Sequence, residues 1–312
     1  MTKRYRIIVN PTADGGAAQD SVATIRTLLE GHNLVFDIVH TERPLHAVSL
    51  AREAVAERCD VVVAAGGDGT ANEVLNGLMQ AKRANEGTAA LGVLCVGRGN
   101  DFAFGTAIPR DLEAGCAALS EDRRRTIDIG RVEGPTLPKE RFFGNGVGIG
   151  FDAVVGFEAA KLKRLRGFLG YLVAALKTIF LYFHAPLVHI EHDTGTLEVA
   201  SLMVSVMNGR RLGGGFMMAP QALVDDGFLN LCIARQVSRP RIFALIARFM
   251  KGTQADHPAI TTLRTQWVSV TARQGVLPAH ADGETLCTEG TQLTIRLLPS
   301  QIEIVCARER TS

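Results

Sequence analysis

The sequence lacks an excess of charge, paired cysteines and a long apolar run. Its 34 basic side chains are nearly balanced by 32 acidic ones, for a net charge of +2. This balance excludes a broad nucleic-acid-binding surface, so any anionic partner must bind at a local group of residues. The six cysteines are scattered without a CxxC pair, which indicates neither a zinc site nor a disulfide framework. We therefore expect reduced thiols, a cytoplasmic location and no nucleic-acid partner.

The apolar segments that are present are short. Ile7-Ile8-Val9 is too brief for a signal peptide, and no export is expected. The stretch from Phe168 to Phe183 is shorter than a spanning helix and carries Lys177 in its second half. A basic collar, Lys161 to Arg166, precedes it, and this pattern suits peripheral contact with an anionic membrane surface. The alternative is a buried helix that packs on a sheet with its basic end in solvent.

The chain is long enough for two domains, since 46% of its 312 residues are hydrophobic. Its first part alternates strand and helix patterns, which predicts a doubly wound α/β domain with a parallel sheet covered on both faces. The expected strands are 6–9, 34–40, 61–65 and 89–96, and the expected helices are 20–29, 45–58 and 71–79. Ligands of such a sheet bind at the carboxyl ends of its strands.

After Gly130 the pattern changes to short alternating segments separated by Gly, Pro and Asp turns. This alternation indicates an antiparallel sandwich or barrel. The expected strands are 197–207, 228–235, 267–272 and 292–297, and a helix is expected at 239–251 with Ile242, Ile246, Phe249 and Met250 as its packing stripe. We expect an α/β domain over residues 1–130, completed by 299–312 through a strand at 302–306, and a β-sandwich domain over 131–298.

The most informative segment is Gly66-Gly67-Asp68-Gly69-Thr70, between a buried strand and a helix. A glycine-rich loop at that position lets backbone N–H groups and a helix start cradle phosphate. A carboxylate among phosphates repels them unless a cation lies between, so Asp68 implies Mg²⁺. The alternative is an ordinary tight turn after a strand. Further special loops follow the other strands, at 10–16, at Thr41 and at 97–101, and they are expected to converge on one rim.

Several motifs occur together in order along the chain. They are NPxAxGG at Asn10 to Gly16, GGDGTxNEVxNG at Gly66 to Gly77, GRGNDFA at Gly97 to Ala103, FxNxxGIGFDA at Phe143 to Ala153, DDG at Asp225 to Gly227 and ADGE at Ala281 to Glu284. This ordered set resembles the diacylglycerol kinase catalytic-domain family, which includes soluble bacterial diacylglycerol kinases and the related sphingosine and ceramide kinases. The resemblance covers nearly the whole chain. It implies an N-terminal domain that binds ATP, as in NAD kinases, and a β-rich domain that helps to form a lipid site.

The resemblance also implies roles for particular residues. Those that would line the nucleotide site are Asn10, Pro11, Thr12, Gly15, Thr41, Gly66, Gly67, Asp68, Gly69, Thr70, Glu73, Arg98 and Asn100. Asp68, Asp101 and Asp128 look like the carboxylates that position catalytic Mg²⁺, through water. Taken alone, Asp101 also suits a helix N-cap, and Asp128 suits the end of a strand. Arg98 is a departure, because the family usually has a small hydroxyl residue there, although a guanidinium could grip phosphate oxygens.

Two acidic turns complete the expected site. The family resemblance makes Glu284 or Asp282 the general base that accepts the proton of the attacking hydroxyl, and we favour Glu284. Alternation along the segment would point both side chains the same way, whereas the alternative reading of Asp282-Gly283 is a plain hairpin turn. Asp226 resembles the ligand of a structural Mg²⁺, although Asp225-Asp226-Gly227 is also a good β-turn.

We therefore expect an ATP- and Mg²⁺-dependent lipid kinase that acts on the hydroxyl of diacylglycerol, which would give phosphatidic acid, or on a similar membrane lipid. The alternatives are a sphingoid-base or phosphatidylglycerol kinase, and a catalytically silent regulator that binds lipid or nucleotide. Self-association into a homodimer is left open.

Overall fold

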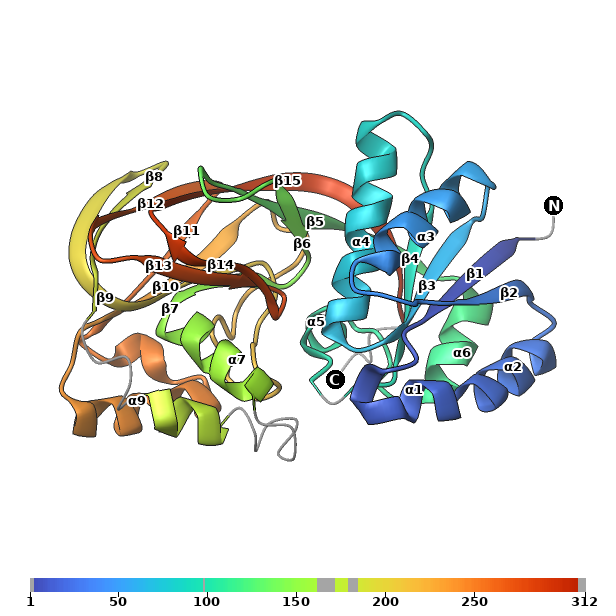
Figure 1. Cartoon of the computed structure of the whole chain (residues 1–312), viewed down its shortest axis with the longest axis horizontal. Coiled ribbons are helices and arrows are strands. Elements are labelled where there is room, and N and C mark those ends of the chain that lie inside the picture. The colour runs from blue at the N-terminus through green and yellow to red at the C-terminus, as the bar shows by residue number, and fades with distance from the viewer. Residues whose placement is uncertain (1–2, 98, 162–171, 179–184, 308–312) are drawn as a thin grey trace. The chain divides into compact units, whose positions relative to one another are not determined.

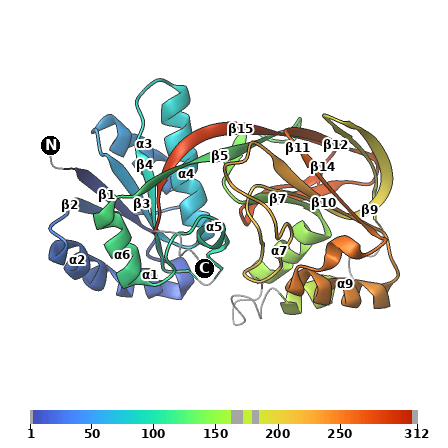
Figure 2. The ribbon, with the colours of Figure 1, turned by 180° about the vertical axis from the view of Figure 1, so that it is seen from behind.

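The computed structural model describes residues 3–97, 99–161, 172–178 and 185–307 (Figure 1). The chain divides into two units, one formed by residues 1–127 with 300–312 and the other by residues 128–299. Two strands, β5 (Arg124–Glu133) and β15 (Gln292–Val305), each begin in one unit and end in the other (Figure 2). Each unit is described by itself below.

The first unit is built on a parallel sheet. Its strands are β1 (Arg4–Val9), β2 (Val35–His40), β3 (Val61–Gly66) and β4 (Ala90–Cys95), in the order β2, β1, β3, β4. Every residue of β3 and β4 is buried, as expected for central strands with helices on both faces. The end of β15 adds a further parallel strand beside β4, where Ile304 pairs with Leu91.

Helices cover both faces of this sheet (Figure 1). On one face, α2 (Val22–Gly31) and α6 (Leu112–Glu121) contribute buried side chains such as Leu29 and Leu119 to the core. On the other, α3 (His46–Ala56) and α4 (Asp68–Arg83) lie against each other so closely that a Cβ on Gly77 would be 2.4 Å from the carbonyl oxygen of Val48. The short helices are η1 (Ala13–Gly16), α1 (Ala17–Asp20) and α5 (Asp101–Gly105).

The second unit is a sandwich of two largely antiparallel sheets. One contains β5, β6 (Arg141–Phe143), β8 (Leu187–His192), β12 (Trp267–Gln274) and β15; the other contains β7 (Gly146–Gly150), β10 (Leu229–Arg235), β11 (Ile260–Thr265), β13 (Leu277–Ala281) and β14 (Glu284–Gly290). The long strand β9 (Gly195–Met207) belongs to both, because its first half pairs with β8 and its second half with β7 and β10. Alternate residues of the two sheets, such as Ile190, Val206 and Ile295, face each other in the core.

A helical layer covers the outer face of the second sheet. Helix α9 (Arg239–Lys251) buries Ile242, Leu245 and Phe249 against that face, and α7 (Phe151–Lys161) and the helical residues 172–178 lie in the same layer. A short turn, η2 (Gln254–Asp256), follows α9. The expected combination of a doubly wound α/β domain and a β-sandwich is therefore confirmed.

Three local expectations need correction. Helix α4 begins at Asp68, with Gly67 as its N-cap, so the acidic residue of the glycine-rich segment is already helical. The two strands expected at 292–297 and 302–306 are one continuous strand, β15, despite the turn-like Pro299-Ser300. Met250 is 41% exposed and does not belong to the packing stripe of α9, where Leu245 takes its place.

Candidate active site

The loops that follow β3 and β4 approach each other at two glycines. The N–H of Val96 donates to the carbonyl oxygen of Gly66 at 3.0 Å. A Cβ on Gly97 would lie only 2.6 Å from the Cα of Gly67, so no larger residue fits between the two loops. This close approach exposes backbone at the carboxyl ends of the central strands, where an open α/β sheet binds its ligands.

The loop after β1 joins the same rim. Asn10 donates from Nδ2 to Oγ1 of Thr70 at 3.3 Å, and its Oδ1 accepts from both the N–H and the hydroxyl of Thr12. The N–H of Thr41 donates to the carbonyl oxygen of Val9 at 2.9 Å, which holds the loop after β2 beside it. Gly15 has a φ of 73°, a backbone conformation that glycine adopts without strain. The structure thus brings together the predicted residues of these loops in the first unit.

Two carboxylates gather around Gly99. Asp68 lies at the start of α4 and accepts from the N–H of Phe102 through Oδ1 at 3.0 Å. A Cβ on Gly99 would lie 2.8 Å from Oδ2 of Asp68 and 4.0 Å from Oδ2 of Asp101, so both carboxylates lie near this glycine and no larger residue fits beside Asp68. Asn100 shapes this loop with a φ of 51° and a bond from Nδ2 to the carbonyl oxygen of Gly97 at 2.6 Å.

This pair of carboxylates fits Mg²⁺, which takes one or two protein carboxylates and completes its shell with water and phosphate oxygens. Over the described part of the chain, no three His, Cys, Asp or Glu side chains gather closely enough to hold a metal ion by themselves. The charge of Asp68 also affects the neighbouring thiol of Cys95. Burial raises the pKa of this thiol to about 12, and the charge of Asp68 makes the second largest contribution.

Glu73 has a structural partner rather than an open carboxylate. Its two oxygens accept the N–H groups of Leu45 and Ala47 at 3.0 and 3.1 Å, at the start of α3. A carboxylate there satisfies amides that the helix itself cannot pair. This arrangement holds the start of α3 on α4, and the expected nucleotide contact of Glu73 stays a prediction.

Asp128 and Asp226 lie together in the second unit. Asp128 is buried, and its Oδ2 accepts from the N–H of Gly227 at 2.8 Å, which holds the turn that contains Asp226. Asp226 accepts from the N–H of Phe228 and forms an ion pair with Nη2 of Arg264 at 2.6 Å. Asp226 is thus paired with a guanidinium in this structure, and its expected role as a metal ligand stays a prediction. Arg98 lies outside the described residues.

The two carboxylates of the acidic turn at the end of β13 differ in burial. Asp282 is 6% exposed, and its carboxylate accepts three backbone N–H groups, those of Gly144, Asn145 and Gly146, at 2.8 to 3.0 Å. Asp282 and Gly283 have φ values of 47° and 86°, and Ala281 pairs with Glu284 across them. The segment is therefore a two-residue hairpin, so strand alternation does not run through it, and a common direction of the two side chains stays a prediction. Glu284 is only partly buried.

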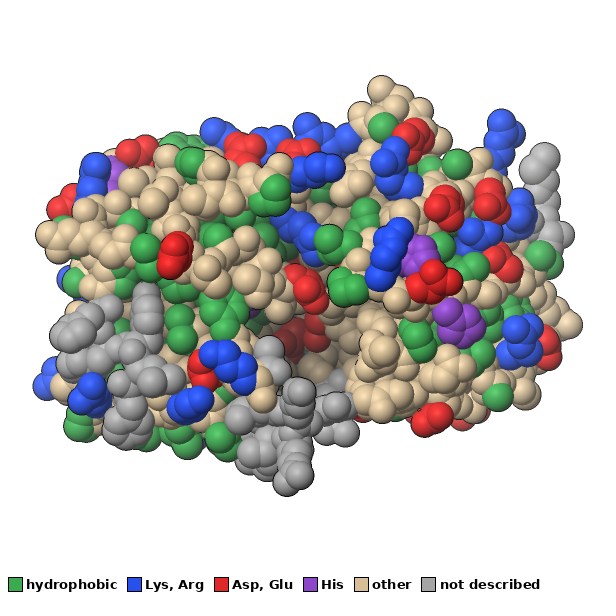
Figure 3. All heavy atoms as spheres, in the orientation of Figure 1, with side chains coloured by type: hydrophobic (Ala, Val, Ile, Leu, Met, Phe, Trp, Pro, Cys, Tyr) green, Lys and Arg blue, Asp and Glu red, His purple; other side chains and the backbone are tan. Residues whose placement is uncertain are grey.

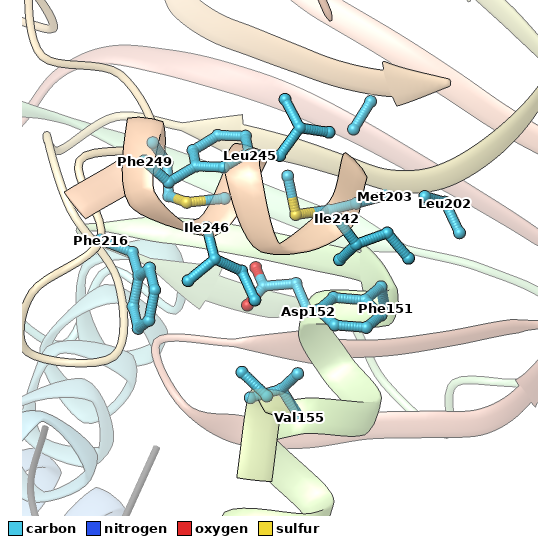
Figure 4. Close-up of a pocket in the computed structure, with 13 residues that line it drawn as sticks. Phe151, Asp152, Val155, Leu202, Met203, Phe216, Ile242, Leu245, Ile246 and Phe249 are labelled. Carbon is cyan, nitrogen blue, oxygen red and sulfur yellow. The ribbon is translucent and has the colours of Figure 1, made fainter. Parts of the chain in front are cut away.

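An apolar cavity lies under α9 (Figure 4). It measures about 60 Å³ and is lined from α9 by Ile242, Leu245, Ile246 and Phe249, and from α7 by residues that include Phe151 and Asp152. Figure 4 shows the carboxylate of Asp152 among these apolar side chains. Sequence reasoning missed Asp152 as a site residue; the only available signal was an acidic residue inside the FxNxxGIGFDA motif.

Comparison with known proteins accounts for both units. Residues 4–132 match the diacylglycerol kinase catalytic domain, and residues 145–306 match the YegS C-terminal NAD kinase beta sandwich-like domain. A YegS-like lipid kinase of Chromohalobacter salexigens is 32% identical, over 90% of this chain and 86% of its own. A diacylglycerol kinase of Staphylococcus saprophyticus is 26% identical, over 91% and 90%.

The chain belongs to the diacylglycerol kinase family of lipid kinases.

Solved structures agree on the fold of this lipid kinase. A diacylglycerol kinase of Bacillus anthracis superposes with a TM-score of 0.72 at 20% identity, over 98% of this chain and 97% of that one. An NAD kinase of Archaeoglobus fulgidus in complex with ATP gives a TM-score of 0.53 at 13% identity, over 97% and 93%. As a kinase of this family, the protein uses ATP and acts on a lipid.

The surface charge and the apolar helices of the lipid kinase are relevant to the membrane and nucleic-acid partners considered from the sequence. On the face in Figure 3, basic and acidic side chains are interspersed, in keeping with the balanced composition. Among the helices that the structure describes, none is long and apolar enough to span a membrane. Most of the basic collar and of the apolar helix after it lies outside the described residues. Within 172–178, Ala174 and Ala175 are buried beside Val155, as the buried-helix alternative requires.

Proposed function

We propose that this lipid kinase transfers the γ-phosphate of ATP, with Mg²⁺, to the free hydroxyl of diacylglycerol and so produces phosphatidic acid. The observation that carries the proposal is the hairpin after β13. Asp282 is held by three amides, which leaves Glu284 as the partly exposed carboxylate of the turn. A hydroxyl acceptor needs such a group, and the named relatives that act on diacylglycerol support the choice of lipid.

The nucleotide half of the reaction is assigned to the first unit. Backbone N–H groups of the loops after β1, β3 and β4 would bind the phosphates, and the close contact of Gly67 with Gly97 keeps bulky side chains away from them. Asp68 and Asp101 would hold Mg²⁺, which supplies charge neutralisation for the transferred phosphoryl group.

The acceptor half is assigned to the second unit. Glu284 would accept the hydroxyl proton while the hydroxyl oxygen forms a bond to the γ-phosphorus. The bond from that phosphorus to the oxygen bridging to the β-phosphate breaks, and ADP leaves. The cavity under α9 would take part of an acyl chain, because it is apolar but far smaller than a site for a whole lipid.

We also propose peripheral docking on an anionic bilayer, through α9 as well as the basic collar. No acidic residue occurs between 229 and 255. On α9, Phe243 and Met250 are 44% and 41% exposed, and Arg241 and Lys251 are exposed on the same helix. Exposed apolar and basic side chains on one helix suit the interface of an anionic membrane.

The deciding experiment is transfer of labelled γ-phosphate from ATP to diacylglycerol, sphingosine, ceramide and phosphatidylglycerol in mixed micelles. We expect diacylglycerol to be the labelled product, and Glu284→Gln to lower kcat by at least about a hundredfold, as for loss of a general base. Glu289→Gln, an exposed carboxylate on the same strand, is the matched control and should behave as wild type. Another labelled lipid would favour the sphingoid-base or phosphatidylglycerol alternative, and no labelled lipid would favour the silent regulator.

A further inference from the structure

A buried carboxylate and a buried imidazole meet over a glycine in the second unit. Gly148 of β7 is paired in register with His280 of β13, and Asp152 lies at the start of α7, which follows β7. Nε2 of His280 is 3.5 Å from Oδ2 of Asp152, and each side chain is almost completely buried. A Cβ on Gly148 would lie 2.3 Å from that carboxylate oxygen and 2.4 Å from that nitrogen. Glycine is therefore required for the two side chains to meet.

The charge of Asp152 lies in apolar surroundings. Its neighbours in the cavity under α9 are aliphatic and aromatic side chains. Burial, and after it the charge of Asp152, raises the pKa of the Cys232 thiol to about 12. A charge in such a place needs compensation, and Nε2 of His280 faces it at 3.5 Å, which is an electrostatic contact rather than a close hydrogen bond.

The other side of the imidazole contacts the acidic turn. Nδ1 of His280 accepts the N–H of Gly283 at 3.3 Å. Because Nδ1 accepts, the proton of the neutral ring is on Nε2, the nitrogen that faces Asp152. Gly283 is the second residue of the hairpin, between Asp282 and Glu284. The two residues of the turn are thus held separately: Asp282 by amides of the β6–β7 segment, and Gly283 by His280.

We propose that Asp152 and His280 form a positioning pair for Glu284. Asp152 fixes the tautomer and the ring orientation of His280, and His280 fixes the amide of Gly283 and, through it, the direction of the next side chain. Neither residue touches the reacting atoms. Asp152 lines the apolar cavity and His280 contacts the turn. The pair therefore fixes the position of Glu284 relative to the cavity that would take the acyl chain. This inference rests on the proposed role of Glu284.

Two replacements of His280 separate the two contacts. Asn places an amide oxygen near the position of Nδ1 and can still accept the N–H of Gly283, whereas Gln places its polar end near Nε2 and keeps only the contact with Asp152. We expect His280→Gln to lower kcat by about tenfold to a hundredfold, since small displacements of a catalytic group have that effect. His280→Asn should recover most of this loss. The KM for ATP should stay unchanged in both, because the nucleotide site belongs to the first unit.

Gly148→Ala gives an independent check, because its methyl group would clash with the ring of His280 and displace Nδ1 from the N–H of Gly283. We expect it to lower kcat as His280→Gln does, while each variant keeps a cooperative urea transition and binds ATP like wild type. Equal kcat for His280→Gln and wild type, or equal losses in His280→Asn and His280→Gln, would overturn the inference. If Glu284→Gln itself is fully active, it is the proposed function that fails; an inactive Glu284→Gln beside a fully active His280→Gln removes only the positioning pair.

Discussion

Asp282 and Glu284 show how two carboxylates one residue apart acquire different tasks. The oxygens of Asp282 are used by three backbone amides of the β6–β7 segment, and its left-handed φ of 47° is set by the hairpin. Glu284 begins the next strand and is only partly buried. The first residue therefore holds the turn together, and the second is the one to which the proposed function assigns the chemistry.

We predict that Asp282→Ala lowers the free energy of unfolding by at least about 2 kcal/mol, because buried amides lose a charged acceptor. Urea denaturation of the purified variants measures this change. Glu284→Gln is the companion variant and should unfold at the wild-type urea concentration. Equal stabilities of Asp282→Ala and wild type would contradict the structural role of Asp282.

For a single helix or strand, hydrophobic periodicity predicts the bounds of the element where the pattern is continuous. The helix at 239–251 has the bounds expected from the sequence, since its apolar spacing and its flanking Ser238 and Gly252 are local signals. The end of β15 was misread because Pro299-Ser300 resembles a turn. Alternation cannot predict the direction of Glu284, because it does not continue through a hairpin.

The site itself was only partly accessible from the sequence. Loops that follow parallel strands must meet at one edge, so the approach of the Asn10, Gly67 and Gly97 loops could be expected. The ion pair of Asp226 with Arg264 and the contact of Asp152 with His280 could not, because each joins residues from separate strands or helices. The contact of Glu73 with the start of α3 could not be predicted either, because a carboxylate that caps a neighbouring helix leaves no local pattern.

For α9 we predict charge-dependent membrane binding. The wild-type protein should float with vesicles that contain anionic lipid and remain unbound with purely zwitterionic ones. Arg241→Glu with Lys251→Glu should weaken binding by at least about tenfold, since each basic side chain near an anionic surface contributes roughly 1 kcal/mol. Lys139→Glu, an exposed lysine of the same unit that lies outside α9, is the matched control. Flotation that ignores lipid charge, or equal binding of the α9 variant and wild type, would contradict the proposal.

For the whole molecule, the two cores determine the accessibility of the thiols. Five of the six cysteines are buried, and Cys287 is partly exposed. Burial raises the pKa of Cys95 and Cys232 to about 12 and that of Cys116 to about 11, with lesser contributions from nearby carboxylates. Little reactive thiolate is therefore present in the native protein near neutral pH.

We predict that a thiol reagent modifies no more than one cysteine of the native protein rapidly, and all six after denaturation. Mass spectrometry of the labelled chain identifies the site, which should be Cys287. Cys287→Ser should abolish the rapid phase. Rapid native labelling of Cys95 or Cys232 would mean that one of the cores opens readily in solution.

The division of labour between Asp282 and Glu284 also has an evolutionary consequence. A lineage that loses Asp282 loses part of the support of its fold, and such a change is removed whatever the protein is used for. A lineage that loses Glu284 keeps its fold, and a single-base substitution converts a glutamate codon to a glutamine codon. On the proposed assignment, a well-folded descendant without kinase activity lies one mutation away, free to be retained as a lipid-binding protein.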